Sequence, residues 1–333
     1  MGYGGGSHIT HHASRITFHV SPSFSSTPPP HWPKKWAVRI CVIFNPTARG
    51  EKARRFRHHL DAIGAQSTLK LTAAAGDARR IAAEAIREGF ESVVAAGGDG
   101  TLNEVLNGFS DVPDGFERAR LGLLPLGTVN VFARELAIPT RLDAAWAAIC
   151  QGRETRIDLP IVDFQASGKR ERRCFAQLAG AGLDARAVEQ VRWQLKKKIG
   201  YLAYVVAGLK ALVGAQSKIT VTGGGHSVTG EQVLIGNGRL YGGQYRVFPQ
   251  ANLSDGRLDV CVFPRVTWFT LAYCGPSLLL RGTLPASATE AFQAESLTLS
   301  SPSTTPLEAD GELLGHLPAT FSLQRSRLRV IVP

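Results

Sequence analysis

The first half of the chain alternates short apolar runs with segments that carry a single apolar face. The runs, rich in β-branched residues, predict buried strands at residues 37–44, 68–72, 92–96 and 121–124. Between them the residue pattern predicts helices at 51–63, 77–88 and 101–109, with Asp77 as the N-cap of the second. Strands that alternate with helices indicate βαβ units, and therefore a doubly wound parallel sheet.

Beyond residue 153 strand-like segments predominate and glycine-rich turns separate them. The predicted strands are 157–164, 174–179, 217–222, 232–236, 257–263, 296–300 and 319–323, with one helix at 198–212. We therefore predict an α/β protein with two domains. Residues 36–152 form the parallel-sheet domain, and residues 153–333 form an antiparallel, β-rich, sandwich-like domain whose final segment is free to return to the first.

The N-terminal 35 residues are predicted to be a disordered leader. Residues 14–33 are rich in Ser and Pro, and the leader lacks the continuous apolar core of a signal peptide. The best candidate for a membrane span, residues 266–280, is about 15 residues long and includes Gly and Pro. Because a helix needs roughly 20 residues to cross a bilayer, no transmembrane segment is predicted.

The net charge indicates which kind of partner the protein binds, and the cysteine content indicates the redox state of its compartment. Lys and Arg number 38 against 27 Asp and Glu, which gives a net charge of +11. This balance suits an anionic partner, such as a phosphate substrate, nucleic acid or an acidic membrane surface. The five cysteines are scattered without metal-binding spacing, which indicates a reducing compartment, and Cys174 and Cys261 in apolar strands are predicted to be inert packing residues.

The segment Gly97-Gly98-Asp99-Gly100-Thr101 joins a predicted strand to a predicted helix. Glycines allow close approach of an anion to the backbone, and the N–H groups of the helix N-terminus can then bind phosphate. The site also lies at the carboxyl end of a parallel strand, where open α/β sheets bind ligands. A tight turn with an aspartate cap would use the same residues, so this loop alone decides nothing.

Polar, glycine-containing loops also follow two other predicted strands. Asn45-Pro46 with Gly50 ends the first strand, and residues 125–128 with Asn130 end the fourth. Neither segment contains the spacing of a P-loop or of a dinucleotide-binding fingerprint. Three polar loops at one edge of the sheet instead indicate a nucleotide site assembled from several loops.

Taken in order, these and later motifs resemble the diacylglycerol kinase catalytic family, in the branch of bacterial lipid kinases related to sphingosine and ceramide kinases. The resemblance covers about residues 37–333. The motifs that carry it are 44–46 with Gly50, 97–104, 125–130 with 132–133, 181–185, 200–204, 242–243, 252–259 and 310–312. NAD kinases share the Gly-Gly-Asp-Gly loop, but the later motifs follow the lipid kinase pattern.

The resemblance implies an ATP-dependent, magnesium-requiring lipid kinase with its active site between the two domains. It implies that Glu312 accepts the proton of the lipid hydroxyl, with Asp310 and Asp99 as the other catalytic carboxylates. It implies a magnesium site at Asn252, Asp255 and Arg257. The implied ATP contacts are Asn45, Pro46, Thr47, Thr72, Gly97, Gly98, Asp99, Gly100, Thr101, Asn103, Glu104, Gly127, Thr128 and Asn130.

One position departs from the family pattern. Many relatives have Asp directly after the Asn of the Pro-x-Gly-Thr-x-Asn motif, whereas this chain has Val131. We predict that Asp99 and Asp158 supply the carboxylate–water network around the metal. The departure bears on the metal site rather than on the kinase assignment.

Partners and alternatives follow from the same features. We expect a cytoplasmic enzyme that docks peripherally on an anionic membrane to reach a lipid alcohol, with Lys196–Lys198 as one basic candidate for the contact. Trp268, Phe269 and residues 278–280 are predicted to fill the core, with lining of a lipid cavity as the alternative. No pattern for nucleic-acid binding is present. A regulator without turnover and an NAD kinase are the alternative functions, and a homodimer is left open.

Overall fold

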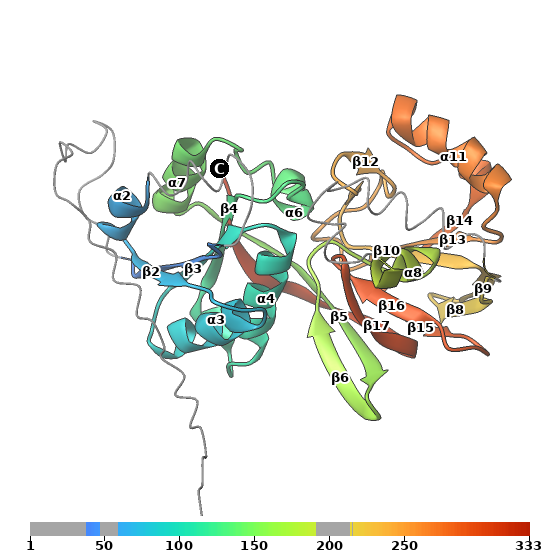
Figure 1. The fold of residues 1–333 in the computed structure, drawn as a ribbon, viewed down its shortest axis with the longest axis horizontal. Helices are drawn as coiled ribbons and strands as arrows, with labels where there is room; N and C mark the ends of the chain where they lie inside the picture. Colours follow the sequence, from blue (N-terminus) through green and yellow to red (C-terminus); the bar gives the residue numbers. More distant parts are fainter. Residues whose placement is uncertain (1–37, 47–58, 191–213, 215) are drawn as a thin grey trace, which may run out of the picture. The chain divides into compact units, whose positions relative to one another are not determined.

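The computed structural model describes residues 38–46, 59–190, 214 and 216–333. It confirms the α/β fold class. Strands β1 (Ile40–Phe44), β2 (Thr68–Leu71), β3 (Ser92–Gly97) and β4 (Arg120–Pro125) pair in parallel in the order β4-β3-β1-β2 (Figure 1). Every residue of β1 and β3 is buried, as expected for a parallel sheet with covered faces.

Helices connect and cover these strands. They are α2 (Leu60–Gly64), α3 (Asp77–Arg87), α4 (Asp99–Ser110), α5 (Gly115–Arg118), α6 (Val131–Glu135) and α7 (Leu142–Gln151). Figure 1 shows α3 and α4 on one side of the parallel sheet and α7 on the other. The predicted helix at 51–63 lies largely outside the described residues.

The predicted N-cap of α3 is wrong by one residue. Gly76 occupies the cap position in the left-handed region (φ 86°), and no side chain caps the helix from there. The Asp77 carboxylate instead accepts the N–H groups of Ala73 and Ala74 at 2.8 and 3.0 Å. It therefore fixes the loop before the helix, a role that the sequence pattern does not distinguish from capping.

The second half is β-rich and mainly antiparallel, as predicted. Its strands are β5 (Glu154–Ala166), β6 (Lys169–Cys174), β7 (Leu178–Gly182), β8 (Ile219–Gly223), β9 (His226–Gly230), β10 (Gln232–Gly236), β11 (Leu240–Tyr241), β12 (Tyr245–Arg246), β13 (Leu258–Phe263), β14 (Glu290–Ala294), β15 (Ser296–Ser300), β16 (Pro306–Ala309) and β17 (Glu312–Ile331). Helices α8 (Leu183–Gln190) and α11 (Trp268–Arg281) and the short 3-10 helix η1 (Ala286–Ala288) interrupt them. The predicted helix at 198–212 lies outside the described residues.

Strand β17 joins two groups of strands. Its start pairs with β16 in the order β14-β13-β10-β7-β16-β17, and its later residues pair with β15 and β5. One apolar cluster takes side chains from both groups, including Val233 and Val260 from the first and Val162 and Leu299 from the second. The two groups therefore pack face to face. The end of β17 also pairs in parallel with β4, where Val330 lies opposite Leu121.

The predicted strand at 174–179 is divided in the structure. β6 ends at Cys174 and β7 begins at Leu178, and the residues between them turn their N–H groups toward Asp310. An apolar run cannot reveal this interruption, because Phe175 and Ala176 are buried in the loop as fully as they would be in a strand.

The structure contradicts the prediction of a core position for Trp268, Phe269, Leu279 and Leu280, whereas Leu278 packs against an apolar core cluster. They belong to α11, and Trp268, Phe269 and Leu280 are 56, 86 and 86% exposed. The apolar residues surround this helix on all sides, a pattern typical of a buried helix, but only one side of α11 packs on the protein. In the described part of the chain, no helix is both long and apolar enough to cross a membrane.

Candidate active site

Two of the predicted glycine loops touch backbone to backbone. The Gly97 carbonyl accepts the N–H groups of Leu126 and Gly127 at 2.9 and 3.2 Å. A Cβ added to Gly127 would lie 2.5 Å from the Cα of Gly98, closer than carbon atoms can approach. Because β2 lies on one side of β1 and β3 on the other, these loops adjoin the point where the strand order reverses, which is where doubly wound sheets bind ligands.

Asn130 holds the second loop in place. Its backbone adopts the left-handed conformation (φ 52°), which asparagine tolerates better than most residues. Its side-chain Oδ1 accepts the Gly127 N–H at 3.0 Å, and its Nδ2 donates to the Gly127 carbonyl at 2.7 Å. The motif Pro-x-Gly-Thr-x-Asn therefore closes on itself and leaves Thr128 at its tip exposed.

A substitution at Gly127 tests this loop contact. We expect Gly127→Ala to push the two loops apart and to weaken nucleotide binding by about tenfold or more, because the methyl group and Gly98 cannot occupy the same space. Gly64→Ala is the control, since nothing lies within 4 Å of an added Cβ there. Equal nucleotide affinities of the two variants in isothermal titration calorimetry would contradict the assigned loop geometry.

Asp99 lies between the loops and the acidic motif of the second half. Burial and, next, the nearby charge of Asp310 raise its pKa to about 6, while the N–H groups of Val131, Phe132 and Asn130 lower it. The carboxylate thus faces the start of α6. Val131, which stands where many relatives have Asp, therefore offers its N–H rather than a second carboxylate.

Asp310 is held by four donors. Its Oδ2 accepts from the Ala176 N–H at 2.7 Å and from Asn103 Nδ2 at 3.0 Å, and its Oδ1 accepts the N–H groups of Gln177 and Leu178 at 3.0 and 3.2 Å. Burial raises its pKa, and these donors oppose the shift. Because Asn103 lies on α4, this carboxylate ties the first glycine loop to the turn between β16 and β17.

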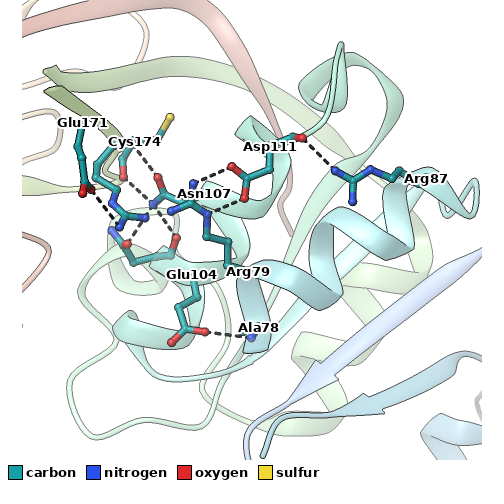
Figure 2. A network of polar contacts seen from close by, with 10 residues as sticks. Ala78, Arg79, Arg87, Glu104, Asn107, Asp111, Glu171 and Cys174 are labelled. Atoms are coloured by element: carbon teal, nitrogen blue, oxygen red, sulfur yellow. Dashed lines mark hydrogen bonds and ion pairs between the residues drawn. The ribbon is translucent and has the colours of Figure 1, made fainter. Parts of the chain in front are cut away.

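A second network anchors α4, as Figure 2 shows. Asn107 Nδ2 donates to the Cys174 carbonyl, and Asn107 Oδ1 accepts the Cys174 N–H, both at 3.0 Å. The Glu104 carboxylate accepts the N–H groups of Gly76 and Ala78 at 2.9 Å, at the start of α3. Asn103 and Glu104, both predicted ATP contacts, therefore have side chains engaged within the protein.

Glu312 completes the site from the other side of the turn. A Cβ added to Gly100 would lie 3.4 Å from Glu312 Oε1, so the Glu312 carboxylate lies against the first turn of α4. Glu312 is exposed. Together with Gly98, Asp99 and Asp310 it lines one end of a cavity of about 620 Å³, which we call the polar end. The structure thus brings together the three predicted catalytic carboxylates and the first glycine loop.

The rest of this cavity is mainly apolar, and we call it the apolar end. Its walls come from α8, β10, β13, α11 and the segments that adjoin them. The apolar lining residues are Leu183, Ala187, Val188, Leu234, Val247, Phe263, Leu271, Leu278 and Leu284. The size falls within the range of small-molecule sites, and the composition suits an acyl chain.

Sequence analysis missed a carboxyl pair in this cavity, in which the buried Glu308 meets the partly buried Asp184. Tyr241 donates its hydroxyl to Asp184 Oδ1 at 2.7 Å, and the Gly311 N–H donates to Glu308 Oε2 at 2.8 Å. The other two oxygens converge, because a Cβ at Gly180 would lie 3.1 Å from Glu308 Oε1 and 3.2 Å from Asp184 Oδ2. Burial raises the pKa of both groups, and the Asp184 charge raises that of Glu308 further, so we infer that they share a proton. The sequence feature that could have indicated this pair is the glutamate within the otherwise apolar segment of β16.

This pair predicts a pH-dependent stability. As pH rises from the ordinary pKa of glutamate toward the raised value, the unfolded chain releases a proton that the folded chain keeps, so stability falls. We expect Glu308→Gln to remove this loss. The melting temperature of the variant should match wild type near pH 5 and exceed it by a few degrees near pH 8, since 1 kcal/mol corresponds to about 2–4 °C for a larger domain.

The control for this prediction is Glu290→Gln, because Glu290 is exposed. Its melting curve should follow wild type at every pH. Parallel melting curves for Glu308→Gln and wild type across the same range would show that the pair is not protonated in the folded protein.

The remaining predicted ATP contacts have mixed positions. Asn45 and Pro46 follow β1, and the Asn45 N–H donates to the Ala96 carbonyl at 3.3 Å. Thr72 follows β2 and is buried, as is Thr101 on α4. Thr47, a predicted contact, and Gly50, a residue of the first loop motif, lie outside the described residues. The strand ends of β1, β2, β3 and β4 thus lie at one edge, but contact of each residue with ATP stays a prediction.

The predicted magnesium loop at Asn252, Asp255 and Arg257 has internal hydrogen bonds. Asn252 Oδ1 accepts the Ser254 N–H at 3.1 Å, and Asp255 Oδ1 accepts the Arg257 N–H at 3.0 Å. Among the described residues, no three His, Cys, Asp or Glu side chains lie together as a metal site. Backbone carbonyls and the Asp255 carboxylate are the oxygen donors available here, so the metal assignment stays a prediction.

Asp158 belongs to this loop rather than to the cavity. Its Oδ2 accepts the Gly256 N–H at 2.7 Å, and its Oδ1 accepts the Ser326 N–H at 2.6 Å. Asp158 does not line the cavity that holds Asp99. The structure therefore separates the two carboxylates that were predicted to share one metal network, because the Asp158 side chain fixes the loop against β17.

Two glycine loops at the ends of parallel strands share one cavity with acidic side chains and an apolar wall, and this arrangement is typical of a phosphotransferase with an apolar acceptor. Comparison with known families agrees. Residues 39–162 match the diacylglycerol kinase catalytic domain, and residues 177–332 match the YegS C-terminal NAD kinase beta sandwich-like domain. The chain belongs to the diacylglycerol kinase catalytic-domain family and is a lipid kinase.

Individual relatives support the same assignment over most of the chain. A diacylglycerol kinase of Staphylococcus carnosus is 30% identical over 303 residues, which cover 89% of this chain and 95% of the relative. One of Staphylococcus aureus is 30% identical over 303 residues, covering 89% of this chain and 92% of the relative. A crystal structure of a diacylglycerol kinase from Bacillus anthracis shares the fold, with a TM-score of 0.65 at 20% identity, over 89% of this chain and 97% of that one.

Proposed function

We propose that this protein transfers the γ-phosphate of ATP to the free hydroxyl of a diacylglycerol-like lipid. The observation that carries the proposal is the position of Glu312. Its carboxylate lies against the first turn of α4, at the polar end of a cavity whose other end is apolar. A lipid with its acyl chains in the apolar end would present its hydroxyl beside Glu312 and the glycine loops.

The glycine loops suit the phosphates of ATP. Gly98 precedes α4 with an extended backbone, and the contact of Gly98 with Gly127 leaves no side chain between the two loops. The N-terminal N–H groups of a helix favour negative charge. The net charge of +11 favours encounter with an anionic nucleotide over a longer range.

No three carboxylates of the described residues converge as a metal site, so magnesium at the polar end would take a carboxylate oxygen here and complete its shell with phosphate and water oxygens. Asp99, Asp310 and Glu312 offer carboxylate oxygens, the ligands that this hard cation prefers. Because Asp310 already accepts four hydrogen bonds, Asp99 is the best placed of the three to hold the ion together with the phosphates. Bound magnesium would neutralise charge on the transferring phosphate. At the second site, Asp255 and the carbonyls of Asn252 and Arg257 would hold a structural ion.

Different side chains of this protein have different roles in the proposed phosphate transfer. Glu312 accepts the proton of the lipid hydroxyl while the oxygen forms its bond to the γ-phosphorus and the bond from that phosphorus to the bridging oxygen of ADP breaks. Asp310, fixed by its four donors, positions the turn that carries Glu312. The apolar walls exclude water, which would otherwise compete with the lipid as acceptor.

Diacylglycerol is the acceptor that we favour, with phosphatidylglycerol and sphingoid bases as the competing lipid alcohols. The relatives in Staphylococcus carry the name diacylglycerol kinase, and the apolar end suits chains rather than a second nucleotide. NAD as acceptor would require polar groups in place of that wall. A regulator without turnover would not need Glu312 beside the phosphate site.

An acceptor panel tests the proposal. Purified protein is incubated with γ-labelled ATP, magnesium and, separately, diacylglycerol, phosphatidylglycerol, sphingosine and NAD, and the products are resolved. We expect label in phosphatidic acid, and none when magnesium is omitted. Label only in NADP, or ATP binding without any labelled product, would overturn the assignment of a lipid acceptor.

A further inference from the structure

Helix α11 has an unusual outer face. The residues at its exposed positions are Trp268, Phe269, Ala272, Tyr273, Pro276, Leu279 and Leu280, followed by Arg281. Their spacing of one, three and four residues places them on one side of the helix. Trp268, Phe269, Tyr273, Leu279 and Leu280 are between 56 and 86% exposed. We call this set the outer stripe, and its large apolar side chains face solvent together.

The opposite face of the same helix lines the cavity. Thr270, Leu271, Cys274 and Leu278 form part of the cavity wall. Among the described residues, α11 thus forms one part of the wall of the apolar end, with apolar side chains on both of its faces. Thr267 and Thr270 close a capping box at its start and Gly282 ends it, so the helix is well defined without packing on its outer side.

Arginines border the outer stripe, and the acidic side chain at the start of α11, Glu231, accepts the Val266 N–H at 2.7 Å and is paired with Lys218 at 2.9 Å. Between residues 264 and 289 the chain contains no Asp or Glu, and its charged residues there are Arg265 and Arg281. Arg246 is adjacent to the end of the helix, because its N–H donates to the Gly282 carbonyl at 2.6 Å. All three arginines are exposed. An apolar stripe that carries Trp and Tyr and is bordered by arginine matches the chemistry of an anionic bilayer surface.

We propose that the outer stripe of α11 inserts into an anionic lipid bilayer and opens the apolar end of the cavity toward the membrane. The proposal rests on the proposed function for the identity of the cavity ligand, but the docking itself requires no turnover. The arginines contact lipid headgroups while the aromatic and leucine side chains enter the acyl boundary. A lipid acceptor then reaches the cavity beside α11 without crossing water.

Vesicle sedimentation in the absence of ATP tests the docking. The vesicles contain phosphatidylcholine with phosphatidylserine, neither of which has an acceptor hydroxyl of the proposed kind. We expect Phe269→Ser combined with Leu280→Ser to lower the vesicle partition coefficient about tenfold or more.

Arg265→Gln combined with Arg281→Gln should remove the preference for anionic over neutral vesicles, and high salt should weaken wild-type binding. Leu71→Ser, at an exposed apolar residue on β2, is the control and should bind as wild type.

A second measurement reports the insertion directly and does not depend on a folding-sensitive variant. All five native cysteines are buried, so Ala272→Cys provides a selective site for an environment-sensitive dye in the middle of the stripe. Its emission should shift to the blue on addition of anionic vesicles, whereas dye at Leu71→Cys should not respond.

The outcomes separate the alternatives. Unchanged vesicle binding by the Phe269→Ser and Leu280→Ser variant, or an unshifted dye, would overturn the proposal. A concentration-dependent dimer that this variant dissociates would identify a second copy of the chain as the occupant and would also overturn it. Docking without phosphate transfer in the acceptor panel would leave the docking intact and reject only the proposed function.

Discussion

Replacing Glu312 with glutamine is expected to lower the turnover number about 10²- to 10⁴-fold, the usual contribution of a general base. The amide keeps the shape of the side chain but cannot accept the proton of the lipid hydroxyl. Because Glu312 is exposed, the melting temperature should stay within about a degree of wild type. ATP affinity should change little, since the proposed phosphate site uses the backbone of the two glycine loops rather than this side chain.

The measurement is the initial rate of phosphate transfer at saturating ATP, together with calorimetric ATP binding. Glu290→Gln, at the exposed start of β14, is the matched control and should transfer phosphate at the wild-type rate. A Glu312→Gln enzyme that keeps wild-type turnover would remove Glu312 from the chemistry and leave it a role in positioning at most.

Asp310→Asn is expected to damage both stability and activity. In the wild type, Asp310 Oδ2 accepts hydrogen bonds from the Ala176 N–H and from Asn103 Nδ2. The side-chain nitrogen of asparagine cannot accept a hydrogen bond, so at least one of these two bonds is lost. Hydrogen bonds to charged groups contribute about 1.5–3 kcal/mol each. We expect a loss of about 2–4 kcal/mol in the free energy of unfolding and a drop of about 100-fold or more in turnover, because the turn that carries Glu312 loses its anchor.

Urea unfolding and transfer kinetics measure the two effects. Asp114→Asn is a suitable control, since Asp114 also has a left-handed backbone (φ 54° against 49° for Asp310) but is exposed. Its substitution tests backbone conformation without the buried hydrogen bonds. If Asp310→Asn were as stable as Asp114→Asn, the four hydrogen bonds would not be holding the turn.

The parallel sheet was predictable because each of its strands carries a local signal. The run at β1 is wholly apolar and ends at Asn45-Pro46, and the run at β3 ends at Gly97-Gly98. Both signals act over fewer than ten residues, within reach of sequence patterns. The glycines themselves were also informative, because the contact of Gly98 with Gly127 excludes side chains in the structure.

Features that depend on distant residues were not predictable in this way. The Asp310 carboxylate interrupts the strand expected at 174–179 through N–H groups more than 130 residues away in sequence. Asp184 and Glu308 come together because β16 pairs with β7, which leads directly into α8. A single acidic residue in an apolar segment gives no indication of its partner.

The exposure of α11 shows a different limit of prediction from hydropathy. Its apolar residues surround the helix, and burial within the protein is the usual reason for that pattern. The structure leaves the outer stripe exposed, with Phe269 at 86%. Hydropathy reports which side chains avoid water, but it does not distinguish a protein core from a lipid surface.

The central claim is that this cavity transfers phosphate to a lipid hydroxyl, and the most direct test is one transfer assay. Wild type and Glu312→Gln are incubated with γ-labelled ATP, magnesium and diacylglycerol in mixed micelles, and labelled phosphatidic acid is quantified. We predict labelled phosphatidic acid from wild type and at least about 100-fold less from the variant, at equal ATP binding. Equal production by both proteins, or ATP binding by wild type without labelled lipid, would contradict the account.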